Sequence, residues 1–418
     1  MIDTLQLIHR EVYEMAKIGI AFAAATVAAL SMGTTGRAQD AAEVMHSWTS
    51  EGEAAAIAKF ADAFNAAGGK WIDIATAGGN NSRSAAVARI IAGSPPDAAQ
   101  FNTSTQFYDL VSSGKLNSLQ SYAAKGNWEK VIPEALLNVA KRDGEIYALP
   151  VNMSGVNFVF YSNKVLADAG ISRPPVDWDG MLAAMETLKG KGLVPLAVGG
   201  DGYIGLVFYS ILADYLGTEH YNRLFTKRDP TVDEAGILKT FQTFAKLRDY
   251  TDSNWSGRSW NQATQMLING QAGFQVVGDW AKAEFISNKL TAGKEYGCML
   301  PKGTVIMGGD VIIFPKKGDA ISPAQDKLIQ AFADVKAQTE FSLLKGSIPA
   351  RTDVNPADFD VCSQAALKAA SSPETRSPRP RMVIPSDVEG EIEDMLVEFF
   401  GSTMSPEEGA EQFSDLLQ

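Results

Sequence analysis

The feature that most constrains the fold is the regular alternation of strand and helix patterns in the first part of the chain. Glu43–Trp48, Trp71–Thr76 and Asp97–Phe101 read as strands. Between them, Glu51–Ala66 carries an apolar stripe at helical spacing, and a second helix begins at Ser82 and runs through Ile91. The order β-α-β-α-β predicts an α/β fold in which helices flank a mostly parallel sheet.

A parallel sheet binds its ligands at the carboxyl ends of its strands. The loops Trp48–Glu53, Ala77–Asn81 and Gln100–Thr103 follow these ends. We therefore expect them to converge on one site.

The rest of the chain continues the alternation without a clear linker. Further strands are expected at Val156–Tyr161, Val194–Val198, Gly273–Val277, Gly297–Leu300 and Val311–Phe314, and helical patterns dominate Gly205–Thr251 and most of Ala324–Gln418. A second unit begins near Pro150. Two lobes joined by several crossings of the chain fit this pattern.

The N-terminal segment resembles a signal peptide. Residues 18–36 carry no charge and are rich in alanine, Lys17 precedes them, and Gly36 and Ala38 are small residues at the −3 and −1 positions. We expect residues 1–38 to be removed by cleavage after Ala38 and the protein to be exported to the periplasm. Translation starts at Met1 or at Met15. The alternative interpretation of the segment is a membrane anchor.

Composition excludes several classes of function. The chain holds 37 Lys and Arg against 49 Asp and Glu, a net charge of −12, which disfavours nucleic acid as a partner. Only three histidines occur, so a histidine-based metal site or catalytic triad is not expected. We expect no metal and no cofactor. In an oxidising compartment Cys298 and Cys362 either pair or remain a buried free pair, and the sequence leaves both open.

Sequence motifs of catalysis are scarce. Gly200–Gly205 matches G-x-G-x-x-G, but a glycine-rich loop near a small ligand explains it better than nucleotide binding, because Asp201 would repel a pyrophosphate. No spacing singles out a carboxylate pair for glycoside hydrolysis. Aromatic and amide side chains instead gather near the expected strand ends, a mixture that suits carbohydrate, although each tryptophan alone could belong to the core.

Several segments in order resemble the extracellular solute-binding proteins of ABC sugar transporters, within them the glucose-type monosaccharide-binding proteins. They are Val44–Glu53 (VMHSWTSEGE), Asp97–Asn102 (DAAQFN), Tyr161–Gly170 (YSNKVLADAG), Gly270–Trp280 (GQAGFQVVGDW) and Lys345–Arg351 (KGSIPAR). The resemblance implies a two-lobed periplasmic-binding-protein fold with the ligand cleft between the lobes. It assigns residues 39–149 and about 300–345 to an N-terminal lobe, and 150–299 and about 346–418 to a C-terminal lobe.

The resemblance also implies the function. The protein would be a monomer without catalytic residues that closes on a glucose-like aldose and delivers it to a membrane permease. The implied sugar contacts are Trp48, Glu53, Gln100, Asn102, Trp260, Trp280, Asp310 and Lys345, with Arg381 where relatives place a histidine. Ser47 stands where relatives have a second tryptophan, and Asn102 where they tend to have a basic or imidazole side chain. These departures leave a disaccharide, a glycoside or a sugar acid as alternative ligands, and an exported glycoside hydrolase as the alternative class.

Overall fold

The first strands and helices follow the predicted order. Strands β1 (Asp40–His46), β2 (Gly69–Ala75) and β3 (Ala98–Asn102) alternate with helices α2 (Glu51–Ala66) and α3 (Gly79–Ile91). Strands β1 and β3 are parallel, with Val44 opposite Ala98. The expected α/β unit is therefore present, with strand bounds shifted by one to three residues.

This computed structural model describes residues 40–200 and 202–418, and Ala41–Gln418 form one compact unit. The predicted signal peptide at residues 1–38, the cleavage site after Ala38 and the choice between Met1 and Met15 lie outside the described residues. None of the helices in the described ranges is both long enough and apolar enough to cross a membrane.

Later strands enlarge the first sheet. They are β6 (Ala148–Gly155), β11 (Val305–Ile313), β12 (Ile348–Pro349) and β13 (Arg376–Pro378). The order is β12-β6-β11-β3-β1-β2, with β13 beside β11. β11 runs antiparallel to both β3 and β6, and β12 runs antiparallel to β6. The expectation of a mostly parallel sheet is corrected here, because the chain re-enters this sheet in the opposite direction.

A second sheet contains β7 (Phe158–Ser162), β8 (Val194–Ala197), β9 (Ala272–Val277) and β10 (Tyr296–Met299), in the order β10-β7-β9-β8. Here β7 is antiparallel to both neighbours, and only β8 and β9 are parallel. This sheet is also mixed rather than mostly parallel. A separate small hairpin pairs β4 (Lys141–Arg142) with β5 (Glu145–Ile146).

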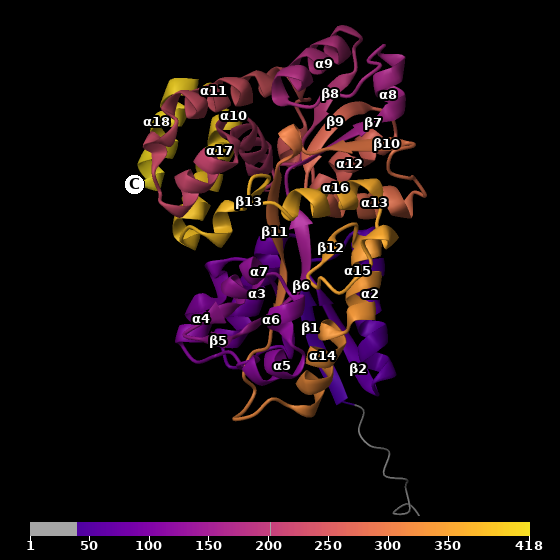
Figure 1. The fold of residues 1–418 in the computed structure, drawn as a ribbon, viewed down its shortest axis with the longest axis vertical. Helices are drawn as coiled ribbons and strands as arrows, with labels where there is room; N and C mark the ends of the chain where they lie inside the picture. The colour runs from indigo at the N-terminus through magenta and orange to yellow at the C-terminus, as the bar shows by residue number, and fades with distance from the viewer. Residues whose placement is uncertain (1–39, 201) are drawn as a thin grey trace, which may run out of the picture. The chain divides into compact units, whose positions relative to one another are not determined.

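Helices surround both sheets (Figure 1). Two helices that come late in the sequence, α14 (Pro323–Ala333) and α15 (Val335–Lys345), pack against α2. A group of four helices packs together beside the second sheet: α10 (Ile204–Thr226), α11 (Glu234–Lys246), α17 (Ser386–Gly401) and α18 (Pro406–Leu417). The remaining helices are α4 (Tyr108–Ser112), α5 (Gln120–Lys125), α6 (Trp128–Val131), α7 (Glu134–Ala140), α8 (Asn163–Asp168), α9 (Trp178–Gly190), α12 (Trp260–Ile268), α13 (Lys282–Ser287) and α16 (Val361–Ala370).

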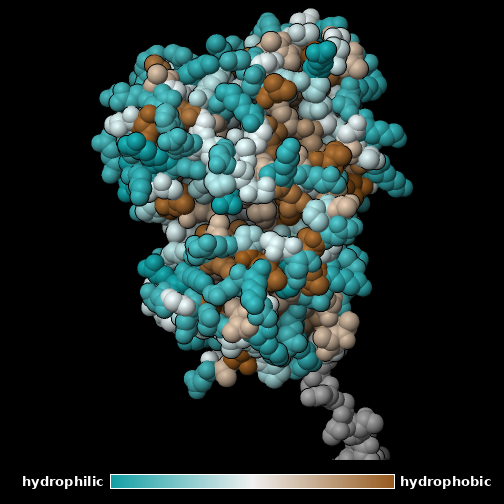
Figure 2. Space-filling view, viewed as in Figure 1, coloured by the Kyte–Doolittle hydropathy of each residue, from teal (hydrophilic) through white to brown (hydrophobic). Residues whose placement is uncertain are grey.

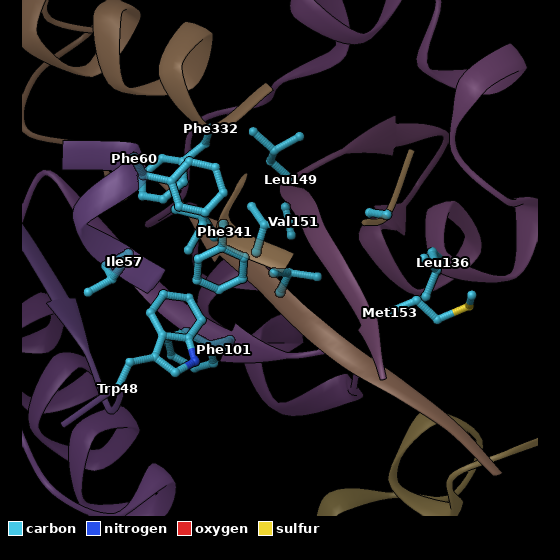
Figure 3. Packing of buried hydrophobic residues seen from close by; sticks show 14 of the residues in the cluster. Trp48, Ile57, Phe60, Phe101, Leu136, Leu149, Val151, Met153, Phe332 and Phe341 are labelled. Atoms are coloured by element: carbon cyan, nitrogen blue, oxygen red, sulfur yellow. The ribbon is translucent and has the colours of Figure 1, made fainter. Parts of the chain in front are cut away.

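Two hydrophobic cores stabilise the structure. In the first core, the ring of Phe60 lies 4.7 Å from that of Phe332 and 4.8 Å from that of Phe341, and Trp48 packs against Phe341 (Figure 3). The second core is centred on aromatic side chains of the four-helix group, including Phe208. On the face shown in Figure 2, hydrophilic residues cover most of the surface and hydrophobic residues form separate smaller groups.

Two neighbouring strands, β11 and β6, contact both cores and carry residues of the site. On β11, Ile306 belongs to the second core, whereas Met307 and Val311 belong to the first. Strand β6 lies beside it, and the residue that follows β6, Val156, belongs to the second core. The predicted lobe boundary between residues 149 and 150 falls inside β6. Asp310, near the middle of β11, lies between β3 and β6 in the first sheet.

The two cysteines form a disulfide. Cys298 in β10 is bonded to Cys362 in α16, with their Cα atoms 5.9 Å apart. Of the two alternatives that the sequence leaves open, the structure has the pair. It ties the second sheet to a helix that lies 64 residues further along the chain.

Candidate functional site

The loop after β1 positions the first two predicted site residues. Trp48 is only 2% exposed and packs on Phe341. Its backbone N–H donates to Nδ1 of His46, whose Nε2 contacts Asp73 at 2.7 Å. His46 is thus a buried, hydrogen-bonded core residue, as its place in a strand pattern suggests. His46 and Asp73, which support this loop, do not line the cavity that Trp48 borders.

Glu53 is positioned by the first turn of α2. Ser50 caps the helix: its Oγ accepts from the backbone N–H of Glu53 and donates to Glu53 Oε2 at 3.2 Å. The carboxyl group is buried, and this burial raises its pKa to about 7, against the opposing effect of Lys345. Near neutral pH, Glu53 therefore exchanges between an acceptor and a donor of hydrogen bonds.

Asp310 is the centre of the polar network. Its Oδ1 accepts from Gln100 Nε2 at 2.8 Å and from Asn102 Nδ2 at 3.1 Å. Its Oδ2 accepts from Asn152 Nδ2 at 3.0 Å and lies 3.3 Å from Lys345 Nζ. All four partners are polar side chains, so this buried carboxylate is fully satisfied.

Local backbone geometry aims Asp310 at this position. The register between β11 and β6 shifts between Asp310 and Val311, a bulge of the kind that redirects a side chain. A Cβ atom on Gly309 would lie 2.5 Å from the carbonyl oxygen of Asn152, so only glycine fits there. Glycine at position 309, directly before Asp310, is therefore a structural requirement of the site.

Trp280 supplies the aromatic surface. It is half-buried, and its Nε1 has no hydrogen-bond partner among the residues that the structure describes. Lys345 Nζ lies 5.7 Å from the ring centre. A Cβ atom on Gly278 would lie 2.0 Å from the Trp280 ring, which explains the Gly-x-Trp spacing. The neighbouring Asp279 is buried, and burial raises its pKa to about 6.

Most predicted contacts meet at one cavity of about 490 Å³, which we call the cleft. Eight of the nine predicted residues line it: Trp48, Glu53, Gln100, Asn102, Trp280, Asp310, Lys345 and Arg381. The three predicted loops contribute Trp48, Asn80 and Gln100, among others. The volume is in the range of small-molecule sites.

Trp260 is the predicted residue that does not line the cleft. It begins α12, is buried, and packs 6.4 Å from the ring of Tyr203. Tyr203 takes its place at the cavity, 5.9 Å from Trp280. Tyr203 follows Gly202 in the G-x-G-x-x-G segment, so this motif contributes a loop at the cavity wall. The sequence signal for Tyr203 was the glycine-rich loop itself.

One end of the cleft carries charges that the sequence analysis largely missed. Besides Arg381 it includes Arg83, Arg379, Glu389 and Glu393. Arg381 donates to Glu389 Oε1 at 3.0 and 2.7 Å from Nε and Nη2, and to Asn102 Oδ1 at 3.0 Å. Arg83 also donates to Asn102 Oδ1, at 2.7 Å. Asn102 thus joins this end to Asp310.

The side chains that could bind metal ions are dispersed in the described part of the chain. Within the described ranges, no group of three or more His, Cys, Asp or Glu side chains is arranged to hold a metal ion. The cleft offers hydroxyl-binding amides, an ammonium group and an aromatic ring. Such groups can bind and orient a polar small molecule.

Comparison with known proteins places these observations in a family. Residues 59–369 match the family of bacterial extracellular solute-binding proteins. A protein of Rhizobium meliloti (strain 1021), named as a probable sugar-binding periplasmic protein, is 34% identical over 394 residues, which cover 91% of this chain and 95% of the relative.

Solved structures agree with the fold. A chitin oligosaccharide binding protein superposes with a TM-score of 0.75 at 22% identity, over 90% of this chain and 98% of the other. The bacterial solute receptor AcbH, described as preferring β-D-galactopyranose, also gives 0.75, at 19% identity over 91% and 97% of the two chains. These likenesses confirm the two-lobed α/β fold.

Proposed function

Because the chain belongs to the family of bacterial extracellular solute-binding proteins, we propose that it is the periplasmic substrate-binding component of an ABC importer and that its cleft binds an aldose monosaccharide. The observation that carries this proposal is the position of Lys345. Its Nζ lies 3.3 Å from Asp310 and 5.7 Å from the centre of the Trp280 ring. A flat apolar face and charged hydrogen-bonding groups therefore border the same space, as a sugar requires.

The size of the ligand follows from the aromatic surfaces. Trp48 is packed into the first core and Trp260 lies behind Tyr203. Trp280 and the neighbouring Tyr203, whose ring centres lie 5.9 Å apart, therefore form one aromatic surface at the cleft. A longer sugar would need several stacking faces in a row. A single sugar ring fits one such face, although related structures include both a chitin oligosaccharide binder and a galactopyranose receptor.

In this proposal, transport depends on a conformational change of the protein and not on a covalent reaction. Asn102 and Asp310 come from the first sheet, and Trp280 follows a strand of the second sheet. A sugar that contacts both groups stabilises the closed arrangement of the lobes and shifts the population towards it. The closed form would then dock on the membrane permease. The lobes in this proposal are residues 39–149 with about 300–345, and 150–299 with about 346–418.

The test is a thermal-shift screen of residues 39–418 against neutral monosaccharides, sugar acids, disaccharides and polyols. A ligand at about 100 times its Kd adds roughly 2.7 kcal/mol of stability. We expect a shift with a monosaccharide that is recovered unchanged. The shift should be lost in Trp280→Ala but kept in Trp255→Ala, because Trp255 packs on Phe400 away from the cleft. Turnover of a glycoside would instead favour the hydrolase.

A further inference from the structure

Three guanidinium groups crowd one end of the cleft. Arg83, Arg379 and Arg381, which we call the arginine end, all line the cavity. Three carboxylates lie at the same end: Glu389, Glu393 and Asp394. Asp394 is exposed, so the arginines outnumber the acidic partners that are shielded from solvent.

The three arginines also differ in how closely a carboxylate contacts them. Arg381 binds Glu389 through two N–H groups. The closest approach of Arg379 to Glu393 is 3.9 Å, and burial raises the pKa of Glu393 to about 7, so this carboxylate is only partly ionised at neutral pH. The longer separation and the partial protonation make this pair weaker than Arg381–Glu389, whose charged atoms lie 2.7 Å apart.

Arg83 is the cation that remains without a carboxylate in contact. Among the residues that the structure describes, its hydrogen bonds go to the amide oxygens of Asn80 and Asn102. The side chain is 9% exposed, and burial together with the charges of Arg381 and Arg379 lowers its pKa to about 10. Glu389 attracts Arg83 electrostatically but is already in contact with Arg381. A buried, unpaired cation at a cavity wall favours an anionic ligand group.

The donor geometry suits a carboxylate. A guanidinium carries five N–H groups in a planar fork. The contacts of Arg83 with Asn80 and Asn102 involve Nη2 and Nη1, one N–H each, so three donors remain. A carboxylate accepts two parallel hydrogen bonds from such a fork.

One side chain separates this cation from the proposed sugar contacts. Asn102 accepts from Arg83 at 2.7 Å and donates to Asp310 at 3.1 Å. A single sugar ring that reaches Asp310 can therefore extend a substituent towards Arg83. We propose that the cleft selects an acidic monosaccharide, whose carboxylate binds Arg83 while its hydroxyl groups meet the groups around Asp310. This inference rests on the proposed function, since it names the class of sugar.

The remaining acids of the cleft act against an anion, and each has a reduced effect. Asp310 is paired with Lys345, burial keeps Glu53 partly protonated near neutral pH, and solvent and salt screen the charge of the exposed Asp394. A purely structural role for Arg83 would be to hold Asn102 in place. In that case its replacement would weaken acidic and neutral sugars equally.

The test compares Kd values by isothermal titration calorimetry for D-glucuronate and D-galacturonate with those for D-glucose and D-galactose. We expect at least one acid to bind roughly 10-fold or more tightly than its neutral counterpart, as a charge-assisted pair provides. The preference is expressed as the Kd of the neutral sugar divided by the Kd of the acid. In Arg83→Gln this ratio should fall to about one-tenth of its wild-type value or less. Arg173 is exposed and does not line the cavity, so Arg173→Gln should keep the wild-type ratio.

A conservative variant and a salt series complete the experiment. Arg83→Lys keeps the charge and should retain part of the preference, even if Arg83→Gln fails to fold. In wild type, the preference should decline as NaCl rises from about 50 to about 500 mM. Neutral sugars that bind as tightly as the acids overturn this inference but leave the proposed function standing. Equal losses for acidic and neutral sugars in Arg83→Gln also overturn it. If no monosaccharide binds, the proposed function itself fails.

Discussion

Asn102 and Asp310 stand opposite each other on the antiparallel strands β3 and β11, and the Asn102 side-chain amide donates to Asp310 Oδ1 across 3.1 Å. The same Asn102 accepts from Arg83 and Arg381 through Oδ1. This one side chain therefore connects the carboxylate at the centre of the cleft with the arginine end. A substitution at Asp310 should therefore alter the arginine end, and a substitution at the arginine end should alter the surroundings of Asp310.

Replacing Asp310 should affect both folding and binding. Asp310→Ala leaves three amide donors without an acceptor and the buried Lys345 without its closest anion. Breaking such a buried pair costs about 3–5 kcal/mol. Urea unfolding measures the loss, and calorimetry should show no sugar binding. The matched control is Asp319→Ala at an exposed aspartate, which should leave both unchanged. A folded Asp310→Ala protein with wild-type sugar affinity would remove Asp310 from the site.

Stability should decline between acidic and neutral pH because of Glu53. Burial raises its pKa from 4.5 to about 7, so the folded state binds more protons than the unfolded state between these values. The free energy of unfolding therefore falls as pH rises through this window, by roughly 3 kcal/mol at most for this group. Asp279 and Glu393 add to the decline. Between about pH 5 and about pH 8, the free energy of unfolding should decrease less in Glu53→Gln than in wild type.

The pH experiment has a matched control in the same helix turn. Glu51 is exposed, so Glu51→Gln should keep the wild-type decline. Urea unfolding of the sugar-free protein at the two pH values gives the comparison. Identical declines in Glu53→Gln and wild type would show that Glu53 does not hold its extra proton in the folded state.

The disulfide should contribute strongly to stability. It closes a loop of 64 residues between Cys298 and Cys362, and the chain-entropy relation gives roughly 4 kcal/mol for such a loop. The double variant Cys298→Ser, Cys362→Ser should therefore unfold at lower urea concentration. Reducing agent should shift wild type in the same direction and leave the double variant unchanged. Wild type that is equally stable with and without reductant would contradict the assignment.

Gly309 tests the geometry that aims Asp310. In Gly309→Ala the new Cβ would lie 2.5 Å from the Asn152 carbonyl oxygen, which is backbone and cannot simply turn away. We expect a loss of about 1–3 kcal/mol from overpacking, together with weaker sugar binding. Gly318→Ala is the control, since no atom lies within 4 Å of its added Cβ. Equal stability and affinity of the two variants would contradict the structural requirement at Gly309.

Local patterns were sufficient to predict the start of the fold and the convergence of three loops, whereas the resemblance to solute-binding proteins supplied Trp280, Asp310 and Lys345. The β-α-β-α-β order places strand ends at one edge, and Gln100 and Glu53 meet there for that reason. Strand β6 was missed because its sequence, ALPVNMSG, lacks the alternation of a half-exposed strand: all eight residues are buried. The antiparallel pairings of β11 depend on where the chain returns, which no local pattern encodes.

The positions of some long side chains relative to the cleft also could not be predicted from the sequence. Arg83 lies inside α3, and only tertiary packing brings its guanidinium to Asn102 on β3. Tyr203 lines the cavity where Trp260 was predicted, because the start of α12 packs behind the glycine-rich loop. In each case the residue type was suitable for the site. The direction of the side chain was decided by contacts distant in sequence.

The most direct test of the account is the binding of monosaccharides to residues 39–418, measured by calorimetry in wild type and in Trp280→Ala. The account predicts saturable binding of one monosaccharide per chain, recovery of the sugar unchanged, and loss of that binding in Trp280→Ala while Trp255→Ala retains it. Saturable binding with the same affinity in Trp280→Ala, or no binding of any monosaccharide by wild type, would contradict the assignment of this cleft as a sugar site.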